Sequence, residues 1–239
     1  MIILEKVDST NNYAMALVQR GEAVGDEAVF AKEQTSGKGR RGKTWKSKSG
    51  ENVILTVTEQ MQWLPIQHQF QLSVAASLGC FDFFSKYIKE NIKIKWPNDI
   101  FINDRKAGGI LIENVIKGNL WQWAIIGIGL NINQVNFDEE IKAVSLKQLT
   151  GIHYDVIDLA AELLEAVTKR IYQLKSREFD NLIYQYNDNL FCRDKIVKLK
   201  KGNIVFETKI QKISSVGELI TEDAIERRFE FNEVEWLGI

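Results

Sequence analysis

The spacing of apolar and polar residues predicts a series of short strands between residues 2 and 132. Windows rich in Val, Ile and Phe, in which apolar residues either alternate or run on, are typical of half-buried and fully buried strands. The last two windows are separated only by Lys117-Gly118-Asn119, so we expect them to form a long hairpin. The predicted strands cover residues 2–7, 27–33, 52–58, 92–96, 99–103, 107–116 and 120–132.

Other stretches carry the 3.6-residue apolar period of helices. A first helix is expected to start after a cap at Asp8, Ser9 or Thr10 and to end at Gly21. The remaining helical stretches are residues 69–88 and residues 155–189, and the second of these is long enough for two helices.

The pattern changes after residue 190. Short strands separated by Lys-Gly-Asn, Val-Gly-Glu and Glu-Asp turns follow one another over residues 195–239, which is typical of a small β-barrel or sandwich. We therefore expect two domains, residues 1–190 and residues 191–239.

Composition and charge then exclude several classes of protein and of binding site. A hydrophobic content of 45%, a charged content of 26% and only two prolines indicate an ordered globular protein. The net charge of −1 argues against broad binding to nucleic acid, so we expect any basic site to be local. Isolated His68 and His153 give no metal-ligand spacing, and Cys80 and Cys192 form no CxxC pair and fit a reducing compartment. No apolar stretch reaches membrane-spanning length and no signal peptide begins the chain, so a cytoplasmic protein is expected.

The segment "SGKGRRGKTW", residues 36–45, satisfies the nucleotide-binding P-loop pattern letter for letter. A P-loop needs a helix directly after its Lys-Thr pair, because the backbone N–H groups at the helix amino terminus bind the phosphates. Here Ser49-Gly50-Glu51-Asn52 would break such a helix, and a strand is predicted from residue 52. The sequence therefore argues against a P-loop.

What the segment does provide is a loop with three glycines between two strands. Glycine lets backbone N–H groups approach an anion, and arginine binds phosphate through two parallel hydrogen bonds. A solvated basic loop is the plainer alternative, but Trp45, which can stack on a flat ring, favours a ligand-binding loop. The basic residues of this segment are Lys38, Arg40, Arg41, Lys43 and Lys46.

Three further segments combine strand or turn residues with ligand-binding groups. "KWPNDI" (95–100) is expected to aim an amide and a carboxylate from a turn that proline fixes. "KAGGILIEN" (106–114) places a lysine before two glycines, and "GIGLNIN" (127–133) thins one face of its strand at Gly127 and Gly129. Each segment also has an ordinary structural explanation, as does "DSTNN" (8–12), which would serve as a helix cap.

In their order along the chain, these segments resemble the motifs of biotin protein ligases, also called biotin–[acetyl-CoA carboxylase] ligases. The resemblance rests on Ser9-Thr10-Asn11, "EQTSGKGRRGKTW" (33–45), "KWPNDI", "KAGGILIE" (106–113) and "GIGLNIN". It implies an α+β fold with a mixed, largely antiparallel β-sheet flanked by helices, the class II synthetase-like biotin/lipoate ligase catalytic domain. The segment 191–239 would then be the family's small C-terminal SH3-like β-barrel.

The resemblance also implies a reaction in two steps. Biotin and ATP give biotinyl-5′-AMP and pyrophosphate, and biotin then passes to one lysine of a biotin carboxyl carrier protein of acetyl-CoA carboxylase or a related biotin-dependent carboxylase. A carboxylate that attacks an anionic triphosphate needs cations to offset the repulsion. ATP is the expected co-substrate, Mg²⁺ is expected mainly on the nucleotide phosphates, and no metal site made by the protein is expected.

The residue roles come from the same resemblance. Arg40 and Lys106 are expected to stabilise the transition state, and Asp99 either to orient the acceptor amine or to position magnesium through water. The expected biotin-binding residues are Ser9, Thr10, Asn11, Gln34, Gly37, Lys38, Gly39, Arg40, Lys106, Gly108 and Gly109. The expected ATP-binding residues are Arg40, Arg41, Lys43, Trp45, Asn98 and Asn131.

The chain departs from the family's pattern in two respects, and two other classes of protein are alternatives. Some family members carry an N-terminal DNA-binding domain, but the first predicted strand begins at Ile2, so we expect a ligase that does not bind DNA. Lys38 stands where many relatives have arginine. A lipoate or octanoate ligase would share the fold, and a non-catalytic module that binds RNA or phosphate is a third candidate; the motifs favour biotin. The hairpin at 107–132 would pair edge to edge with a second copy or with a neighbour in the same chain.

Overall fold

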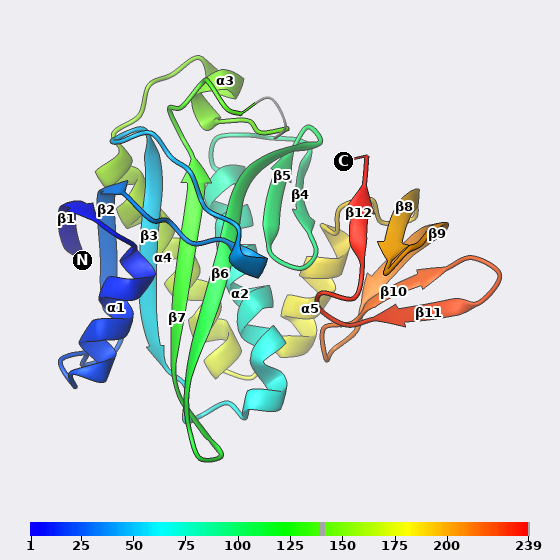
Figure 1. The fold of residues 1–239 in the computed structure, drawn as a ribbon, viewed down its shortest axis with the longest axis horizontal. Coiled ribbons are helices and arrows are strands. Elements are labelled where there is room, and N and C mark those ends of the chain that lie inside the picture. The colour runs from blue at the N-terminus through cyan, green and yellow to red at the C-terminus, as the bar shows by residue number, and fades with distance from the viewer. Residues whose placement is uncertain (139–141, 239) are drawn as a thin grey trace.

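The computed structural model describes residues 1–138 and 142–238. A large sheet, covered by helices, lies beside a smaller sheet formed by the end of the chain (Figure 1). The large sheet has the strand order β1-β2-β3-β7-β6-β5-β4. The β1–β2 pair is parallel and the other neighbouring strands are antiparallel, so the predicted mixed, largely antiparallel sheet is confirmed.

The strands of this sheet fall where the apolar windows predicted them. They are β1 (Ile2–Val7), β2 (Ala28–Gln34), β3 (Asn52–Gln60), β4 (Ile92–Lys95), β5 (Asp99–Ile102), β6 (Arg105–Lys117) and β7 (Leu120–Asn131). The β6–β7 hairpin lies inside the sheet, because β7 also pairs with β3 and β6 also pairs with β5. β3 therefore takes the outer edge of β7, and β5 takes that of β6 only as far as Gly109.

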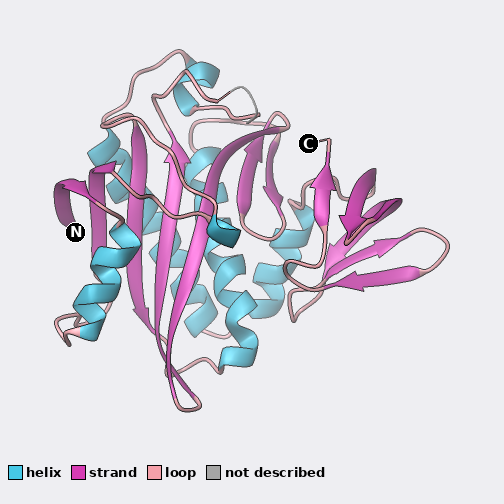
Figure 2. Ribbon diagram, viewed as in Figure 1, coloured by secondary structure: helices cyan, strands magenta, loops and turns pink. Residues whose placement is uncertain are grey.

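The helices lie on both faces of the large sheet (Figure 2). They are α1 (Thr10–Gln19), α2 (Gln69–Ser85), α3 (Leu146–Thr150), α4 (Val156–Lys175) and α5 (Phe179–Asp188), with 3-10 turns η1 (Arg40–Gly42) and η2 (Ile66–His68). The apolar period predicted all of these helices except α3 and the two short turns. A capping box at Ser145 and Gln148 starts α3, a local signal that an apolar-period search does not detect.

The two faces of the sheet have different coverings. Phe30, Leu55 and Ile126 belong to the main core, which α2 and α4 cover. Their strand neighbours Val29 and Ile125 point the other way and pack beneath α1. Adjacent residues of a strand point to opposite faces, so the strands divide the molecule into a helix-covered core and a second face, which we call the α1 face.

The smaller sheet is antiparallel, with the order β11-β10-β9-β8-β12. Its strands are β8 (Ile196–Lys201), β9 (Ile204–Ile213), β10 (Leu219–Glu222), β11 (Glu226–Phe229) and β12 (Glu235–Leu237). The end strands β11 and β12 do not pair with each other within the described part of the chain, so the expected barrel is an open sheet. Both end strands are short, and β12 instead lies beside the large sheet, where Trp236 contacts Phe191.

Aromatic packing joins the two sheets. Trp96 stacks on Phe231 with their ring centres 5.6 Å apart, and its indole N–H donates to the carbonyl oxygen of Gly217 at 3.0 Å. Phe70 of α2 also contacts Phe231, with ring centres 5.5 Å apart. The connection between α5 and β8 runs through the predicted domain boundary near residue 190, which stays a prediction. No helix in the described ranges is both long and apolar enough to cross a membrane.

A close approach of α2 and α4 generates a first prediction. A Cβ atom at Gly79 would lie 2.7 Å from Cα of Val167, a backbone atom that no side-chain rotation can move. Alanine favours a helix over glycine by about 1 kcal/mol, but the overlap forces the two helices apart. We expect Gly79→Ala to lower the free energy of unfolding by roughly 1–3 kcal/mol, measured by chemical denaturation. A more stable variant would show that the helices separate without loss.

A buried carboxyl group generates a second prediction. Glu59 is 3% exposed, and burial raises its pKa from 4.5 to about 7, although Lys175 lies 2.7 Å away. Between these two pH values the folded protein holds a proton that the unfolded chain has lost, so stability falls as pH rises. We expect a loss of about 2–3 kcal/mol from this group, and Glu59→Gln should remove that slope. Equal slopes in the two proteins, measured by urea denaturation from pH 5 to pH 8, would contradict this.

Candidate active site

The glycine-rich segment, residues 36–46, forms what we call the glycine loop, and it lies across the α1 face in front of β6 (Figure 1). It is a small hairpin: the N–H group of Gly39 donates to the carbonyl oxygen of Lys43 at 2.7 Å, and that of Trp45 donates to the carbonyl oxygen of Gly37 at 2.9 Å. The single turn η1 forms its tip. No helix follows Thr44 before β3 begins, so the prediction that this is not a P-loop is confirmed.

Two glycines of β7 leave space for side chains that pack over the sheet. A side chain at Gly127 would overlap the amide of Asn11, and one at Gly129 would overlap the ring of Trp45. Both glycines open onto the α1 face, as the alternation in "GIGLNIN" predicted. Asn131, the next residue on this face, donates from its amide to the carbonyl oxygen of Lys106 at 3.1 Å.

A network of amides and hydroxyls lies at the start of α1. Gln34 Oε1 accepts from the Thr10 backbone N–H at 2.8 Å and from the Thr10 hydroxyl at 3.1 Å. The Thr56 hydroxyl is 2.8 Å from the Thr10 hydroxyl and 2.7 Å from Asn11 Oδ1. Ser9 is buried at the amino end of α1 but makes no side-chain cap bond. These polar side chains bond across the sheet, so helix capping does not explain them.

Glu113 completes this network from β6. It accepts a hydrogen bond from the Asn11 amide at 2.8 Å and pairs with the Lys38 ammonium at 3.1 Å. The carboxylate therefore ties the glycine loop to the start of α1. Sequence reasoning did not assign a role to Glu113 or to Thr56. The alternation of side chains along β6 and β3 could have identified them. Glu113 follows Gly109 at an even spacing, so the two residues face the same side of the sheet.

An ion pair of Lys106 and Asp99 lies on the same side of the sheet. The Lys106 ammonium is 2.8 Å from Asp99 Oδ1. A Cβ atom at Gly109 would lie 3.2 Å from that oxygen and 3.3 Å from the ammonium, so the missing side chain leaves space for the pair. Gly108 faces the other way, against Leu130, and the structure does not bring it to this group.

The arginines of the glycine loop reach the smaller sheet. Arg40 donates to Asn98 Oδ1 and to Asn232 Oδ1, both at 3.0 Å, and its guanidinium lies 5.4 Å from the ring centre of Phe231. Arg41 also donates to Asn232 Oδ1, at 2.8 Å. Burial lowers the pKa of Arg40, and the charge of Asp99 opposes this shift. Asn232 and Phe231 were not expected in the site, because only the fold brings residues 231–232 to the loop.

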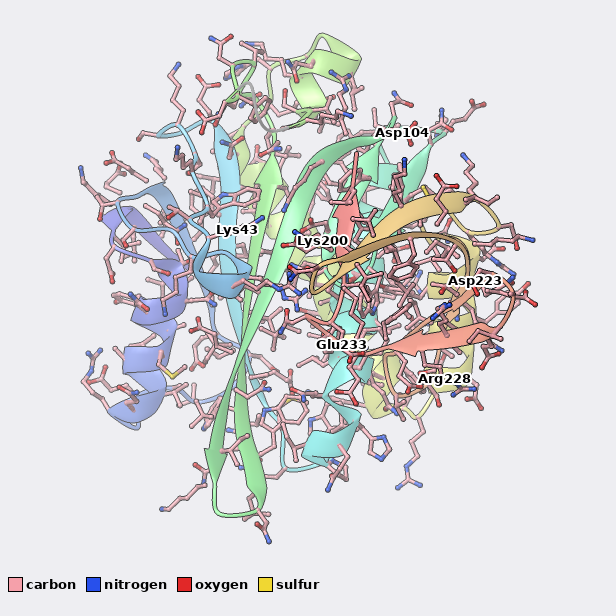
Figure 3. The ribbon with its side chains drawn as sticks, turned by 45° about the vertical axis from the view of Figure 1, so that its right-hand side comes forward. Lys43, Asp104, Lys200, Asp223, Arg228 and Glu233 are labelled. Carbon is pink, nitrogen blue, oxygen red and sulfur yellow. The ribbon has the colours of Figure 1, made fainter. Side chains whose placement is uncertain are left out.

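Figure 3 shows how the charged side chains are distributed around this region. Lys43 lies on the glycine loop, whereas Asp223 and Arg228 lie far from it, on the β10–β11 hairpin (Figure 3). The side chain of Lys43 is exposed to solvent.

Trp45 lies where the polar network meets the charged groups. Its ring covers Gly129, and the Lys106 ammonium is 5.8 Å from the ring centre. Its indole N–H is buried and has no hydrogen-bond partner. The nitrogen lies over Gly129, so it faces the sheet.

The site thus has a polar end, where Glu113 and Lys38 form an ion pair, and a cationic end, joined at Trp45. The polar end offers amide and hydroxyl groups, and the cationic end offers guanidinium and ammonium groups around one carboxylate. No group of three or more His, Cys, Asp or Glu side chains that could hold a metal ion occurs in the described residues. The predicted site residues that the structure gathers here are Thr10, Asn11, Gln34, Lys38, Arg40, Arg41, Trp45, Asn98, Asp99, Lys106, Gly109 and Asn131.

Comparison with known proteins agrees with this geometry. The chain is 31% identical over 164 residues to the bifunctional ligase/repressor BirA of Escherichia coli K12, which covers 68% of this chain and 50% of that protein. It is 29% identical over 177 residues to the biotin–[acetyl-CoA-carboxylase] ligase of Mycobacterium tuberculosis, covering 73% of this chain and 65% of that protein. The chain thus spans about half to two thirds of the length of these relatives.

The fold is similar over nearly the whole chain to a solved structure. Biotin protein ligase from Aquifex aeolicus in complex with biotin and ATP superimposes with a TM-score of 0.83 and 23% identity, covering 98% of this chain and 97% of that one. This likeness confirms the expected α+β fold. The model of the biotin/lipoate A/B protein ligase family matches residues 3–131. Because this match spans more than half of the 239 residues, the protein belongs to the biotin/lipoate A/B protein ligase family.

Proposed function

We propose that the protein is a biotin protein ligase, which forms biotinyl-5′-AMP from biotin and ATP and transfers biotin to a lysine of a carboxylase carrier protein. The observation that carries this proposal is the meeting of a polar pocket rich in amide and hydroxyl groups and a cation cluster at Trp45, on one face of one sheet. The name of one relative, the biotin–[acetyl-CoA-carboxylase] ligase of Mycobacterium tuberculosis, supports the same assignment.

The polar end fits the ureido ring of biotin, which is uncharged and carries both donors and acceptors. Thr10, Asn11 and Gln34 offer an alternating set of hydroxyl and amide groups. These groups bond to one another and to Thr56 and Glu113, so an apolar acyl chain such as that of lipoate or octanoate would lie against polar atoms without hydrogen-bonding to them. We therefore favour biotin over those substrates.

The cationic end fits the nucleotide. In the first step a carboxylate oxygen of biotin forms a bond to the α-phosphorus of ATP, and the bond from that phosphorus to the bridging oxygen of pyrophosphate breaks. Arg40 and Lys106 offset the repulsion between the two anions, and Arg41 and Lys43 hold the triphosphate. Magnesium arrives with the nucleotide phosphates. Trp45 lies beside the adenine.

The second step requires an amine without its proton. The carrier lysine attacks the acyl carbon of biotinyl-5′-AMP, and AMP leaves with the bonding electron pair. Asp99 is the carboxylate nearest to Lys106, at 2.8 Å, and it orients either the acceptor amine or the Lys106 ammonium. Residues 36–46 order over the intermediate and exclude water, which would otherwise hydrolyse the mixed anhydride.

Part of the outer edge of β6 is not paired with β5. β5 pairs with β6 only between Arg105 and Gly109, whereas β7 runs along the other side of β6 as far as Lys117. The outer edge of β6 beyond Gly109 is thus where we place a homodimer contact. Light scattering in solution tests this arrangement.

The activation step generates a third prediction. Lys106→Met keeps the side-chain length but removes the ammonium, so we expect pyrophosphate release with biotin, ATP and magnesium to slow by about 100- to 1,000-fold. Lys169→Met, on an exposed position of α4, is the matched control and should leave the rate unchanged. Lipoate and octanoate should give no release. An unaltered rate in a folded Lys106→Met protein would remove this lysine from the reaction.

The polar pocket generates a fourth prediction. The Cβ atom of Gly127→Ala would overlap the amide of Asn11 and displace it from Thr56 and Glu113. We expect the KM for biotin to rise by roughly 10-fold or more, because about 1.4 kcal/mol or more of binding is lost. The KM for ATP should stay within about twofold, which provides an internal control. A change in the ATP value alone would place biotin elsewhere.

A further inference from the structure

Lys95 is a lysine of the "KWPNDI" segment to which no role has been given. It ends β4, and its ammonium nitrogen lies close to three aromatic rings. The ring centres are 4.7 Å away for Phe101, 5.4 Å for Trp236 and 5.9 Å for Phe191. Among the described residues no carboxylate lies within 4.0 Å of this ammonium and no hydrogen bond is made to it.

Burial and nearby charged groups shift the pKa of Lys95. Burial lowers its pKa from 10.5 to about 8, the Asp99 carboxylate opposes this shift, and the ammonium groups of Lys106 and Lys43 add to it. Cys192 also faces the group, and burial raises the pKa of that thiol. A half-buried cation repelled by two other cations gains from an anion that all three can share.

The register of the β4–β5 hairpin places Lys95 inside the site. Lys95 pairs directly with Asp99 across the turn, and Asp99 binds Lys106 at 2.8 Å. Asn98, in the same turn, accepts from Arg40. Lys106 lies on the Trp45 side of Asp99, next to the polar pocket, whereas Lys95 lies on the β12 side, next to Trp236. Lys95 therefore lies farther from the polar pocket than Lys106 does.

We propose that Lys95 is a phosphate-binding residue of the ATP site, whose ammonium contacts the β- and γ-phosphates that leave as pyrophosphate. This inference rests on the proposed function and names one more residue of the same site. The aromatic rings hold the ammonium in place by cation–π attraction while leaving its three N–H donors without protein acceptors. Phe191 and Trp236 come from the connection to the smaller sheet and from β12, so the end of the chain positions a cation of the nucleotide site.

The test compares Lys95→Met and Lys95→Arg with the matched control Lys93→Met, two residues earlier on β4. Loss of a charge-assisted hydrogen bond costs roughly 10- to 100-fold in affinity. We expect Lys95→Met to raise the KM for ATP by about that factor in pyrophosphate release, with the KM for biotin within about twofold. Lys95→Arg should retain most of the affinity and Lys93→Met all of it.

The pH profile gives a readout that a merely structural lysine would not move. Affinity for ATP in the wild type should fall as pH rises through about 8, since the free enzyme loses the Lys95 proton there. Lys95→Arg should lack this fall, because a guanidinium keeps its charge. An unchanged profile in Lys95→Arg would overturn the inference, and so would an unchanged KM for ATP in folded Lys95→Met.

Calorimetric binding of inorganic tripolyphosphate, without biotin, separates this inference from the proposed function. Weaker binding to Lys95→Met than to the wild type would support the phosphate role whether or not biotin drives pyrophosphate release. Equal binding to both proteins would overturn the role of Lys95. Absence of biotin-dependent release in the wild type would count against the ligase proposal alone.

Discussion

The site depends on one constraint, which is that neighbouring side chains of a strand point to opposite faces of the sheet. Along β7, Ile126, Ile128 and Leu130 fill the core beneath α2 and α4, which forces residues 127, 129 and 131 onto the other face. Glycine at two of those positions leaves space above the sheet for Asn11 and Trp45. β7 therefore contributes side chains to the core on one face and the surface of the site on the other. A shift of its register by one residue would disrupt both.

The arrangement of charges at the cationic end also depends on space left by glycine in the sheet. Lys106 and Asp99 pair in the space that Gly109 leaves, and Arg40 is held by amide oxygens and not by carboxylates. Amides orient a guanidinium without neutralising it, so the positive charge stays available to an anion. A phosphate that reaches Arg40 would replace neutral amide acceptors by charged oxygens, which bind a guanidinium more strongly.

The smaller sheet has a part in this arrangement. Phe231 stacks on Trp96 and lies against Arg40, Asn232 accepts from both loop arginines, and Trp236 contacts Lys95. Its last strand and the turn before it pack on the large sheet and the glycine loop. The sequence left the role of this part of the chain open, and the structure connects it to the cationic end of the site.

The sequence by itself determined the strands and long helices, because their apolar periods are local. It also excluded a P-loop from Ser49-Gly50-Glu51-Asn52 and indicated, from alternation in "GIGLNIN", which face of β7 would be thinned. Only the tertiary structure decided which side chains meet. Asn11 and Glu113 are 102 residues apart, and Arg40 and Asn232 are 192 apart, so no periodicity relates them. The open smaller sheet, the interior position of the β6–β7 hairpin and the aromatic surroundings of Lys95 were also settled there, because each depends on how distant strands pair and pack.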